Sequence, residues 1–232
     1  MPIKTQRFSG PDRFGYLALP EGATKAGMLI LPTIFGINEF ARGYADMLAN
    51  NGIAAAVWDI NSGLPLTTNY KECIARARTL NDTGVVAMLK EWLVFMRGDL
   101  GLTSIGTAGF CIGGRFALLL CAKDKRIKAC VAAYPSIENP RLANQEMDAV
   151  ALSAQVECPV HIVQPGKDHV SSVETYDALN ALLLKRPVAP TTLQFHPIAE
   201  HGFMHRPQPE ENQKATTLAA PQMLAFIRAC LN

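Results

Sequence analysis

A cysteine stands at the centre of a short glycine-rich segment midway along the chain. Residues 109–114 read GFCIGG, so glycines lie two positions before and two positions after Cys111. An apolar run typical of a strand precedes the segment, and the run RFALLLCA, typical of a helix, follows it. A strand, a tight turn that carries a nucleophile, and a helix make up the nucleophile elbow, here with cysteine where serine is commoner. The pattern predicts that Cys111 is a nucleophile.

The elbow has a chemical reason for each of its parts. A strained turn points the nucleophile into the site, and the glycines leave room for the neighbouring strand and helix. The N-terminus of the helix favours negative charge, which stabilises a thiolate and a developing oxyanion, and the backbone N–H of Ile112 is placed to donate to that oxyanion. Two alternatives are a buried cysteine in an ordinary turn and a phosphate-binding turn, although the full GxGxxG motif is absent.

An elbow of this kind requires an acid and then a histidine, each on a loop after a later strand. The strand-like run PVHIVQ ends in a turn that carries Asp168, and the run TTLQFH leads into a turn that carries His201. We expect His201 to take the proton of the Cys111 thiol and later to protonate the leaving group. We expect Asp168 to orient the imidazole.

Three other histidines have plainer interpretations. His161 and His196 lie within strand-like runs, so we expect them to be core or edge residues. His169 follows the predicted acid directly, and we expect its ring to be solvated.

Two other acids compete for the orienting role. Glu200 adjoins His201, but adjacent residues rarely face each other in an extended turn, so it ranks below Asp168. Asp59 also ends a strand-like run and ranks lower still, because such a residue often caps a helix or anchors a loop.

Apolar runs alternate with helical patterns along the chain. We expect core strands at residues 27–31, 53–58, 104–109, 129–134, 159–163 and 191–196, with an antiparallel edge strand at 14–19. We expect helices at residues 39–50, 82–96, 113–122, 172–185 and 213–230. Strands that are apolar throughout suit a parallel sheet covered on both faces. The alternation predicts an α/β fold with a mostly parallel, doubly wound sheet flanked by helices on both faces.

Two irregular stretches, residues 61–71 and 136–158, follow strand ends. Ligands of open α/β sheets lie above those ends, so both stretches are expected to wall a pocket. Pro221 lies inside the last helical pattern and predicts a kink or a restart there. The chain of 232 residues shows no linker or repeat, so we expect one domain over residues 1–232.

The composition excludes several classes of protein. Hydrophobic residues make up 49% and charged residues 18%, which suits a large core rather than disorder. The formal net charge is +2, with Lys and Arg scattered, so we expect no nucleic-acid partner. No run reaches the ~18 apolar residues of a membrane helix, and residues 1–10 lack the apolar stretch of a secretory signal. We therefore expect a cytoplasmic protein with no membrane partner.

The six cysteines are expected to be free thiols. Three disulfides are the alternative, but the chain is large and most of its cysteines lie in apolar segments. The sequence holds no CxxC pair and no Cys/His cluster with zinc-like spacing, so we expect no metal and no other cofactor.

Four segments together resemble the dienelactone hydrolase family. They are LPTIFGINEF at 31–40, GFCIGG at 109–114, GKDH at 166–169 and EHGF at 200–203, in order over nearly the whole chain. The resemblance implies an α/β-hydrolase fold and a Cys-His-Asp triad that hydrolyses small cyclic or enol esters without a metal. Carried over, it gives Cys111, His201 and Asp168, and it adds the backbone N–H of Ile34 as an oxyanion donor beside Ile112.

One departure from the family pattern lies next to the nucleophile. Family members carry a glutamate in the first segment that controls protonation of the thiol, and the matching position here is Thr33. Threonine adds no charge, and its hydroxyl is able to donate a hydrogen bond to sulfur. We therefore expect Cys111 to be partly thiolate in the free enzyme.

The second departure concerns cations. Family members bind the substrate carboxylate with arginines, one of them four residues past the histidine, where this chain has His205 and then Arg206. Lys71, Arg76 and Arg78 lie near the region of the other arginine. Both departures are compatible with hydrolase chemistry, and they leave open whether dienelactone itself is the substrate.

Five residues are expected to contact substrate. Thr33, Phe35, Phe110, Phe203 and Arg206 lie in or next to the motifs, and their apolar content suits a small, partly apolar acyl group. The alternative is that the aromatic residues are ordinary core.

Three functions fit these residues. The first is a hydrolase of small carboxylic esters or lactones that acts through an acyl-enzyme. The second is a thioesterase or acyl transferase of the same fold, and the third is a non-catalytic relative that binds a small molecule. All three triad groups are present, which argues against the third. We expect a small-molecule substrate as partner and a monomer or small homo-oligomer.

Overall fold

The computed structural model describes residues 4–10 and 13–231. Residues 1–3, 11–12 and 232 lie outside this description. The expected lack of a secretory signal at residues 1–10 and the ends of the expected domain 1–232 fall partly on them, so both stay predictions.

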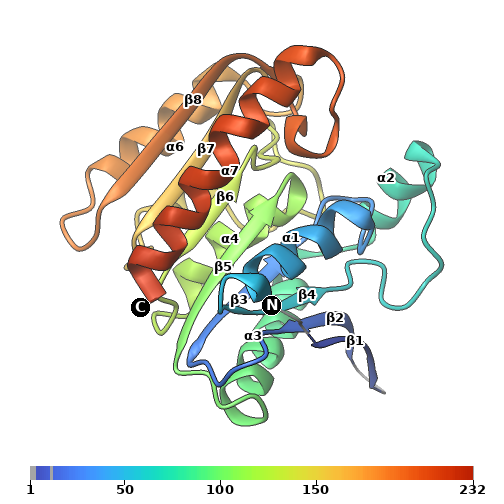
Figure 1. Cartoon of the computed structure of the whole chain (residues 1–232). Coiled ribbons are helices and arrows are strands. Elements are labelled where there is room, and N and C mark those ends of the chain that lie inside the picture. Colours follow the sequence, from blue (N-terminus) through green and yellow to red (C-terminus); the bar gives the residue numbers. More distant parts are fainter. Residues whose placement is uncertain (1–3, 11–12, 232) are drawn as a thin grey trace.

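Eight strands form one sheet (Figure 1). They are β1 (Lys4–Gly10), β2 (Arg13–Leu19), β3 (Ala26–Leu31), β4 (Ala54–Trp58), β5 (Ser104–Phe110), β6 (Cys130–Ala133), β7 (Val160–Lys167) and β8 (Thr191–Glu200). Their order is β1-β2-β4-β3-β5-β6-β7-β8. The strands from β4 to β8 pair in parallel, whereas β2 is antiparallel to both β4 and β1. The predicted, mostly parallel sheet is confirmed.

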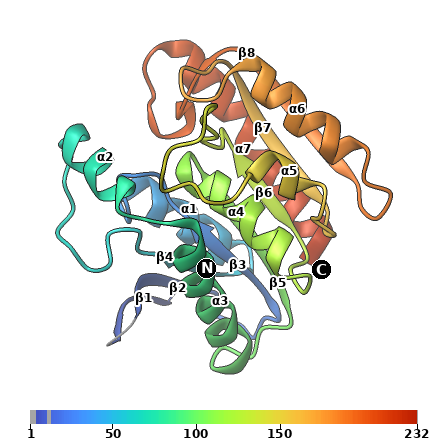
Figure 2. The same cartoon turned by 180° about the vertical axis from the view of Figure 1, so that it is seen from behind.

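The helices of the described residues cover both faces of the sheet. They are α1 (Glu39–Asn50), α2 (Tyr70–Arg78), α3 (Asp82–Gly98), α4 (Ile112–Lys123), α5 (Ala149–Ser153), α6 (Val173–Leu184) and α7 (Glu210–Leu231), with a 3-10 turn η1 (Phe203–His205). One hydrophobic core lies between the sheet and α1 with α7, and the other between the sheet and α3 to α6. Figures 1 and 2 show these two layers from opposite sides. The doubly wound arrangement is therefore confirmed.

Several expected elements differ in detail. The strand predicted at residues 14–19 is not an edge, because β1 pairs with its outer side. β7 and β8 run past their predicted ends because they continue as a paired ribbon with a bulge near Pro165. α7 neither stops nor restarts at Pro221 but continues as one helix.

The structure has two helices that the sequence patterns do not predict: α2, which begins at the end of the irregular stretch 61–71, and α5, which lies inside the stretch 136–158. α2 has only nine residues, and its apolar positions, Tyr70, Cys73, Ile74 and Ala77, form one short stripe that follows a loop-like run of Gly, Pro, Thr and Asn. Asn69 caps it by accepting from Lys71 N at 3.1 Å. Asp148 caps the short α5 in the same way, by accepting from Ala151 N at 2.9 Å.

A crevice follows from the strand order around β3. This strand pairs with β4 on one side and with β5 on the other, and Leu31 at its end lies opposite Gly109. The helix after β3 packs on one face of the sheet and the helix after β5 on the other, so their connections diverge. Such a switch point is where open α/β sheets bind ligands.

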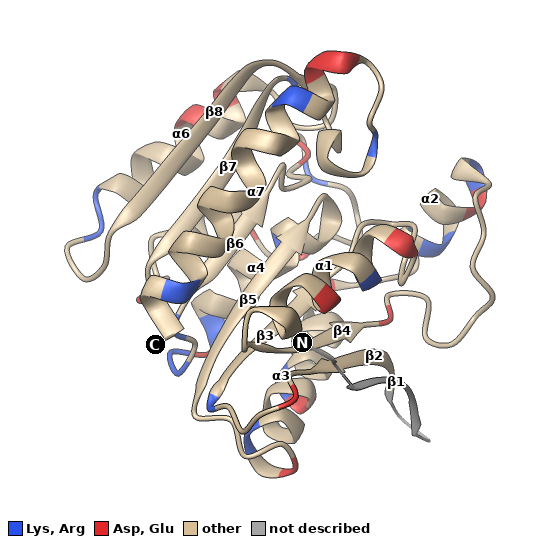
Figure 3. Cartoon of the chain, in the orientation of Figure 1, with Lys and Arg blue, Asp and Glu red and all other residues tan. Residues whose placement is uncertain are grey.

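The surface carries charges of both signs. Figure 3 shows Lys and Arg interspersed with Asp and Glu over the helices of one face. Within the described residues, no helix combines the length and apolarity that crossing a membrane requires.

Candidate active site

Cys111 occupies a strained turn between β5 and α4. Its φ of 57° and ψ of −123° lie in a region that side chains rarely adopt, which costs on the order of 1–3 kcal/mol. A Cβ on Gly109 would lie 2.0 Å from the carbonyl oxygen of Gly113, and a Cβ on Gly113 would lie 2.0 Å from that of Leu31. Only glycine fits at these two positions, so the spacing of the motif has a direct steric cause.

His201 and Asp168 form a buried pair beside the elbow. Asp168 follows β7 and His201 follows β8, and His201 Nδ1 lies 3.0 Å from each carboxylate oxygen. Three more donors hold the carboxylate: Val170 N at 2.8 Å, Ser171 N at 3.0 Å and the Tyr176 hydroxyl at 2.9 Å. Nδ1 therefore donates to Asp168, and Nε2 is left to face the cysteine.

The charges of this pair support each other. Burial raises the pKa of Asp168, but the hydrogen bond and charge of His201 and the backbone N–H donors outweigh it, so the pKa is lowered. Burial lowers the pKa of His201, but hydrogen bonds to Asp168 and Cys111 and their charges raise it to about 9. The imidazole is therefore held in its protonated form at neutral pH.

The Cys111 thiol is biased toward its thiolate. Burial raises the pKa of the thiol. The hydrogen bond and charge of His201, with smaller contributions from the Ser136 hydroxyl and the Ile112 backbone, outweigh burial, so the net pKa is lowered. The hydroxyl that contacts the sulfur is that of Ser136, whose Oγ lies 3.2 Å from Sγ. The Thr33 hydroxyl instead accepts from Phe35 N at 3.3 Å, so the donor expected from Thr33 comes from another loop.

The two predicted oxyanion donors both reach the pocket. Ile34 follows β3 and Ile112 is the first residue of α4, and both line the cavity beside Cys111. Neither N–H donates to a backbone carbonyl within the described residues. The Ile112 N–H instead contributes a hydrogen bond to the Cys111 sulfur, which lowers the pKa of the thiol. Donation by both N–H groups to a bound oxygen stays a prediction.

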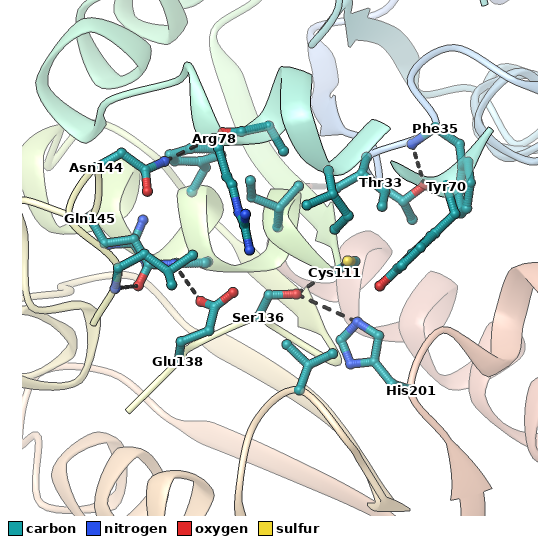
Figure 4. Close-up of a pocket in the computed structure, with 18 of the residues that line it drawn as sticks. Thr33, Phe35, Tyr70, Arg78, Cys111, Ser136, Glu138, Asn144, Gln145 and His201 are labelled. Carbon is teal, nitrogen blue, oxygen red and sulfur yellow. Dashed lines mark hydrogen bonds between the residues drawn. The ribbon is translucent and has the colours of Figure 1, made fainter. Parts of the chain in front are cut away.

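A cavity of about 260 Å³ opens above the sulfur (Figure 4). Its lining comes from the loops after β3, β5, β6, β7 and β8 together with α2 and the first turns of α3 and α4. The lining residues are Thr33, Ile34, Phe35, Tyr70, Ile74, Ala77, Arg78, Asp82, Cys111, Ile112, Arg115, Phe116, Ser136, Glu138, Leu142, Asn144, Gln145, His169, Val170, His201, His205 and Arg206. Both irregular stretches predicted to wall a pocket contribute to it.

Three of the five residues expected to contact substrate line this cavity: Thr33, Phe35 and Arg206. Two do not. Phe110 and Phe203 are buried in the core between the sheet and α1 with α7. The expectation for these two is corrected, because their rings face other aromatic rings rather than the cavity.

The packing of these rings explains the correction. Phe110 lies edge-on to Phe40 and Tyr44, with centroids 5.0 and 4.9 Å away. Phe203 lies 5.5 Å from the Tyr134 ring. Both rings therefore belong to the core between the sheet and α1 with α7, next to the elbow and to the loop after β8.

The competing acids have other roles. Asp59 accepts from Asn61 N at 2.9 Å and from Gly63 N at 3.0 Å, so it anchors the loop after β4, as expected. Among the described residues, Glu200 makes no side-chain hydrogen bond to His201.

The remaining histidines differ from one another. His161 is buried and its Nε2 lies 3.2 Å from Gln194 Oε1, and His196 is buried against Phe203. His169 is exposed, as expected, and it also lines the cavity. Burial, then the charges of neighbouring Arg206 and His201, lower the pKa of His205 to about 4, so this pocket residue is neutral at neutral pH.

A buried ion pair beneath the pocket was not predicted. Arg115 Nη2 lies 2.7 Å from Asp82 Oδ2 and donates to Met147 O at 2.9 Å, while Met147 N donates to the same carboxylate at 2.7 Å. Arg115 and Asp82 are 2% and 1% exposed. The pair fixes α3, α4 and the loop after β6 to one another. Sequence patterns do not reveal such a pair, because its partners lie far apart in the chain.

Of the α2 residues that line the cavity, the sequence singled out only Arg78. Ser136 was not singled out, and its sequence signal is its place two residues past a predicted strand, at the start of the irregular stretch 136–158. Within the described residues, no group of three or more His, Cys, Asp or Glu side chains is arranged to hold a metal ion.

Comparison with known proteins agrees with this geometry. Residues 14–231 match the model of the dienelactone hydrolase family. A carboxymethylenebutenolidase from Rhodococcus opacus is 26% identical over 206 residues, which cover 87% of this chain and 80% of that protein. A candidate 2-oxo-3-(5-oxofuran-2-ylidene)propanoate lactonase from Bradyrhizobium sp. is 28% identical over 158 residues, 66% of this chain and 63% of that protein.

A solved structure shares the fold. It is a candidate dienelactone hydrolase from Klebsiella pneumoniae subsp. pneumoniae, with a TM-score of 0.83 and 21% identity over 98% of this chain and 99% of that one. The family match covers all the strands from β3 to β8 and every residue of the buried Asp–His pair and the elbow. This chain therefore belongs to the dienelactone hydrolase family and is a hydrolase with the α/β-hydrolase fold.

Proposed function

We propose that this protein hydrolyses small carboxylic esters or lactones through an acyl-enzyme on Cys111. The observation that carries the proposal is the continuous set of contacts from Asp168 through His201 and Ser136 to the sulfur, at the base of a cavity of about 260 Å³. That volume lies just below the ~300–1,000 Å³ of pockets for drug-sized ligands, so it suits a small substrate.

The proposed reaction begins with attack of the Cys111 thiolate on the ester carbonyl carbon. The C–S bond forms as the carbonyl π electrons move to oxygen, and the N–H groups of Ile34 and Ile112 stabilise that oxyanion. When the C–O bond breaks, His201 Nε2–H protonates the leaving oxygen. His201 then takes a proton from water, whose oxygen attacks the thioester carbon. The C–S bond breaks, which releases the acid and returns the sulfur as thiolate beside the protonated imidazole. Asp168 holds the imidazole throughout.

The relatives suggest which esters to test. Two of them are named as a carboxymethylenebutenolidase and a lactonase, both of which act on cyclic esters by their names. We extend a lactone preference to this chain as part of the proposal. Arg206 and Arg78 line the cavity and offer cations for a carboxylate on the substrate, since guanidinium pairs with carboxylate through two hydrogen bonds.

The test is turnover of small esters, lactones and thioesters by the purified protein and by Cys111→Ala. Loss of the nucleophile removes the covalent route, so kcat should fall by about 10⁴ or more. Cys230→Ala, which removes a half-buried thiol outside the cavity, is the matched control and should keep wild-type kinetics.

Each outcome has one meaning. Preferential turnover of thioesters would favour a thioesterase. Ester turnover that survives in Cys111→Ala would refute the acyl-enzyme, and binding without turnover by the wild type would refute hydrolysis.

A further inference from the structure

Ser136 lies between two groups whose protons must move during the proposed reaction. Its Oγ lies 3.2 Å from Cys111 Sγ and 3.5 Å from His201 Nε2, and Figure 4 shows it bridging the two. The residue is 6% exposed, so solvent competes little for its hydroxyl. The family resemblance that assigns Cys111, His201 and Asp168 says nothing of this serine.

The backbone of the loop keeps Ser136 at this place independently of its hydroxyl. Its N–H donates to the carbonyl oxygen of Cys111 at 3.0 Å. Next to it, the Ser171 hydroxyl donates to Pro135 O and accepts from Ile137 N, both at 2.8 Å. Tyr134, where the turn begins, has a φ of 39°, which bulky residues rarely adopt. Strain of this kind persists where the surroundings hold it, and it gathers at functional sites.

The chemistry of the three groups fixes the direction of their hydrogen bonds. A thiolate only accepts, and an imidazolium Nε2–H only donates. A hydroxyl does both, so in the ion pair Ser136 accepts from His201 and donates to sulfur. In the neutral pair both bonds reverse: the thiol donates to Ser136, and Ser136 donates to Nε2. The two states differ by one proton on sulfur or imidazole, and the serine is unchanged between them.

We propose that Ser136 is a catalytic residue that donates a hydrogen bond to the Cys111 thiolate and passes the proton between the sulfur and His201. The proton leaves Sγ for Ser136 Oγ while the serine's own proton moves to Nε2. The sulfur therefore loses one proton, the imidazole gains one, and the serine hydroxyl is restored. This role rests on the proposed function of Cys111 and His201. It gives the sulfur a hydroxyl donor from the loop after β6, in place of one from Thr33.

The test is the pH dependence of Cys111 alkylation by iodoacetamide, which reads the thiolate without any substrate. Ser136→Ala removes a hydrogen bond to a charged group, so the midpoint should rise by about one pH unit, a tenfold change in thiolate at lower pH. Its kcat/KM for a chromogenic ester at pH 7 should fall by about tenfold or more. Ser136→Thr keeps the hydroxyl and should return the midpoint toward the wild-type value.

Ser171→Ala is the matched control. It removes the buried hydroxyl that holds the same loop but does not contact the sulfur, so its midpoint should stay at the wild-type value. An unchanged midpoint in Ser136→Ala would overturn the proposal, as would an equal rise in Ser171→Ala, since either result reduces Ser136 to a loop residue. The two proposals fail separately. If Cys111→Ala is inactive but the alkylation midpoint of Ser136→Ala equals that of the wild type, the role of Ser136 is rejected and the proposed function of Cys111 stands.

Discussion

The two sides of the pocket are built in different ways. On the catalytic side, Cys111, His201 and Asp168 follow strands of the sheet, and backbone contacts leave no space for a side chain at the flanking glycines. On the α2 side, residues 61–78 lie beyond the end of β4, where Leu64 is 55% exposed and Tyr70 51% exposed. Figures 1 and 2 show α2 standing away from the two helical layers.

Both sides nevertheless contact the same cavity. Figure 4 shows Arg78 and Tyr70 pointing into the pocket from α2, with the Tyr70 hydroxyl directed toward the sulfur and the imidazole. The hydrogen bonds from Asn144 Nδ2 to Leu80 O at 2.7 Å and Ala77 O at 3.4 Å join the end of α2 to the loop after β6. The sheet therefore positions the residues of the proposed triad, whereas the α2 residues that line the same cavity stand on a lightly packed wall. Changes on the catalytic side should therefore lower kcat, and changes on the α2 side should raise KM.

The largest effect is expected from breaking the contact that orients the imidazole. Asp168→Asn keeps the shape but can hold His201 in the wrong tautomer, so kcat should fall by orders of magnitude, up to ~10⁴ as in a related serine system. Glu200→Gln is the matched control and should cost much less, because Glu200 makes no side-chain hydrogen bond to His201 within the described residues. Steady-state kinetics on one chromogenic ester measure both, and the opposite ranking would refute the assignment of Asp168.

A smaller change should follow from placing a charge beside the sulfur. Thr33 is 2% exposed and lines the cavity next to the elbow, so Thr33→Glu sets a carboxylate there. A carboxylate raises the pKa of a nearby thiol, opposing the lowering by His201. In the wild type the thiolate fraction should rise with pH through a midpoint below the ordinary value of a free thiol, about 8.5.

The measurement is the rate of iodoacetamide inactivation across pH in both proteins. Alkylation at neutral pH should be slower in Thr33→Glu, by about tenfold for each unit that the midpoint rises. A wild-type midpoint at or above the free-thiol value, with no slowing in the variant, would show that another group suppresses the thiolate.

The smallest effect is expected from the two arginines of the cavity, Arg78 at the end of α2 and Arg206 in the loop after β8. Arg206→Ala and Arg78→Ala should each raise KM for esters that carry a carboxylate by about tenfold, while KM for neutral esters and kcat change little. Arg76→Ala is the matched control, because Arg76 pairs with Glu72 and with Pro65 O outside the cavity. Equal changes for charged and neutral esters would mean that these arginines only shape the wall.

The difference between the two sides of the pocket also explains which parts of the structure the sequence could predict. Strands, helices and the elbow on the catalytic side leave strong local signals: apolar runs, a strand-to-helix turn and glycines at fixed spacing. α2 has only nine residues and one short apolar stripe after a loop-like run, so the patterns missed it. β1 was missed as well.

Long-range contacts were beyond the sequence patterns. The sequence placed Phe110 and Phe203 near the motifs, but only the packing against Phe40, Tyr44 and Tyr134 shows that their rings face the core. Ser136 and Cys111 are 25 positions apart in the chain, and local sequence patterns do not predict a contact between residues so far apart.

The central claim is that Cys111 carries the acyl group, and the most direct measurement is the mass of the trapped intermediate. The protein is mixed with a slowly hydrolysed ester, quenched in acid during turnover, and cleaved with trypsin. Trypsin separates Cys111 from Ser136 because Arg115 and Lys128 lie between them. We expect one acyl group, on the peptide that contains Cys111, and its disappearance after further turnover. An acyl group on the peptide that contains Ser136, or turnover with no acyl-enzyme on Cys111 at any quench time, would contradict it.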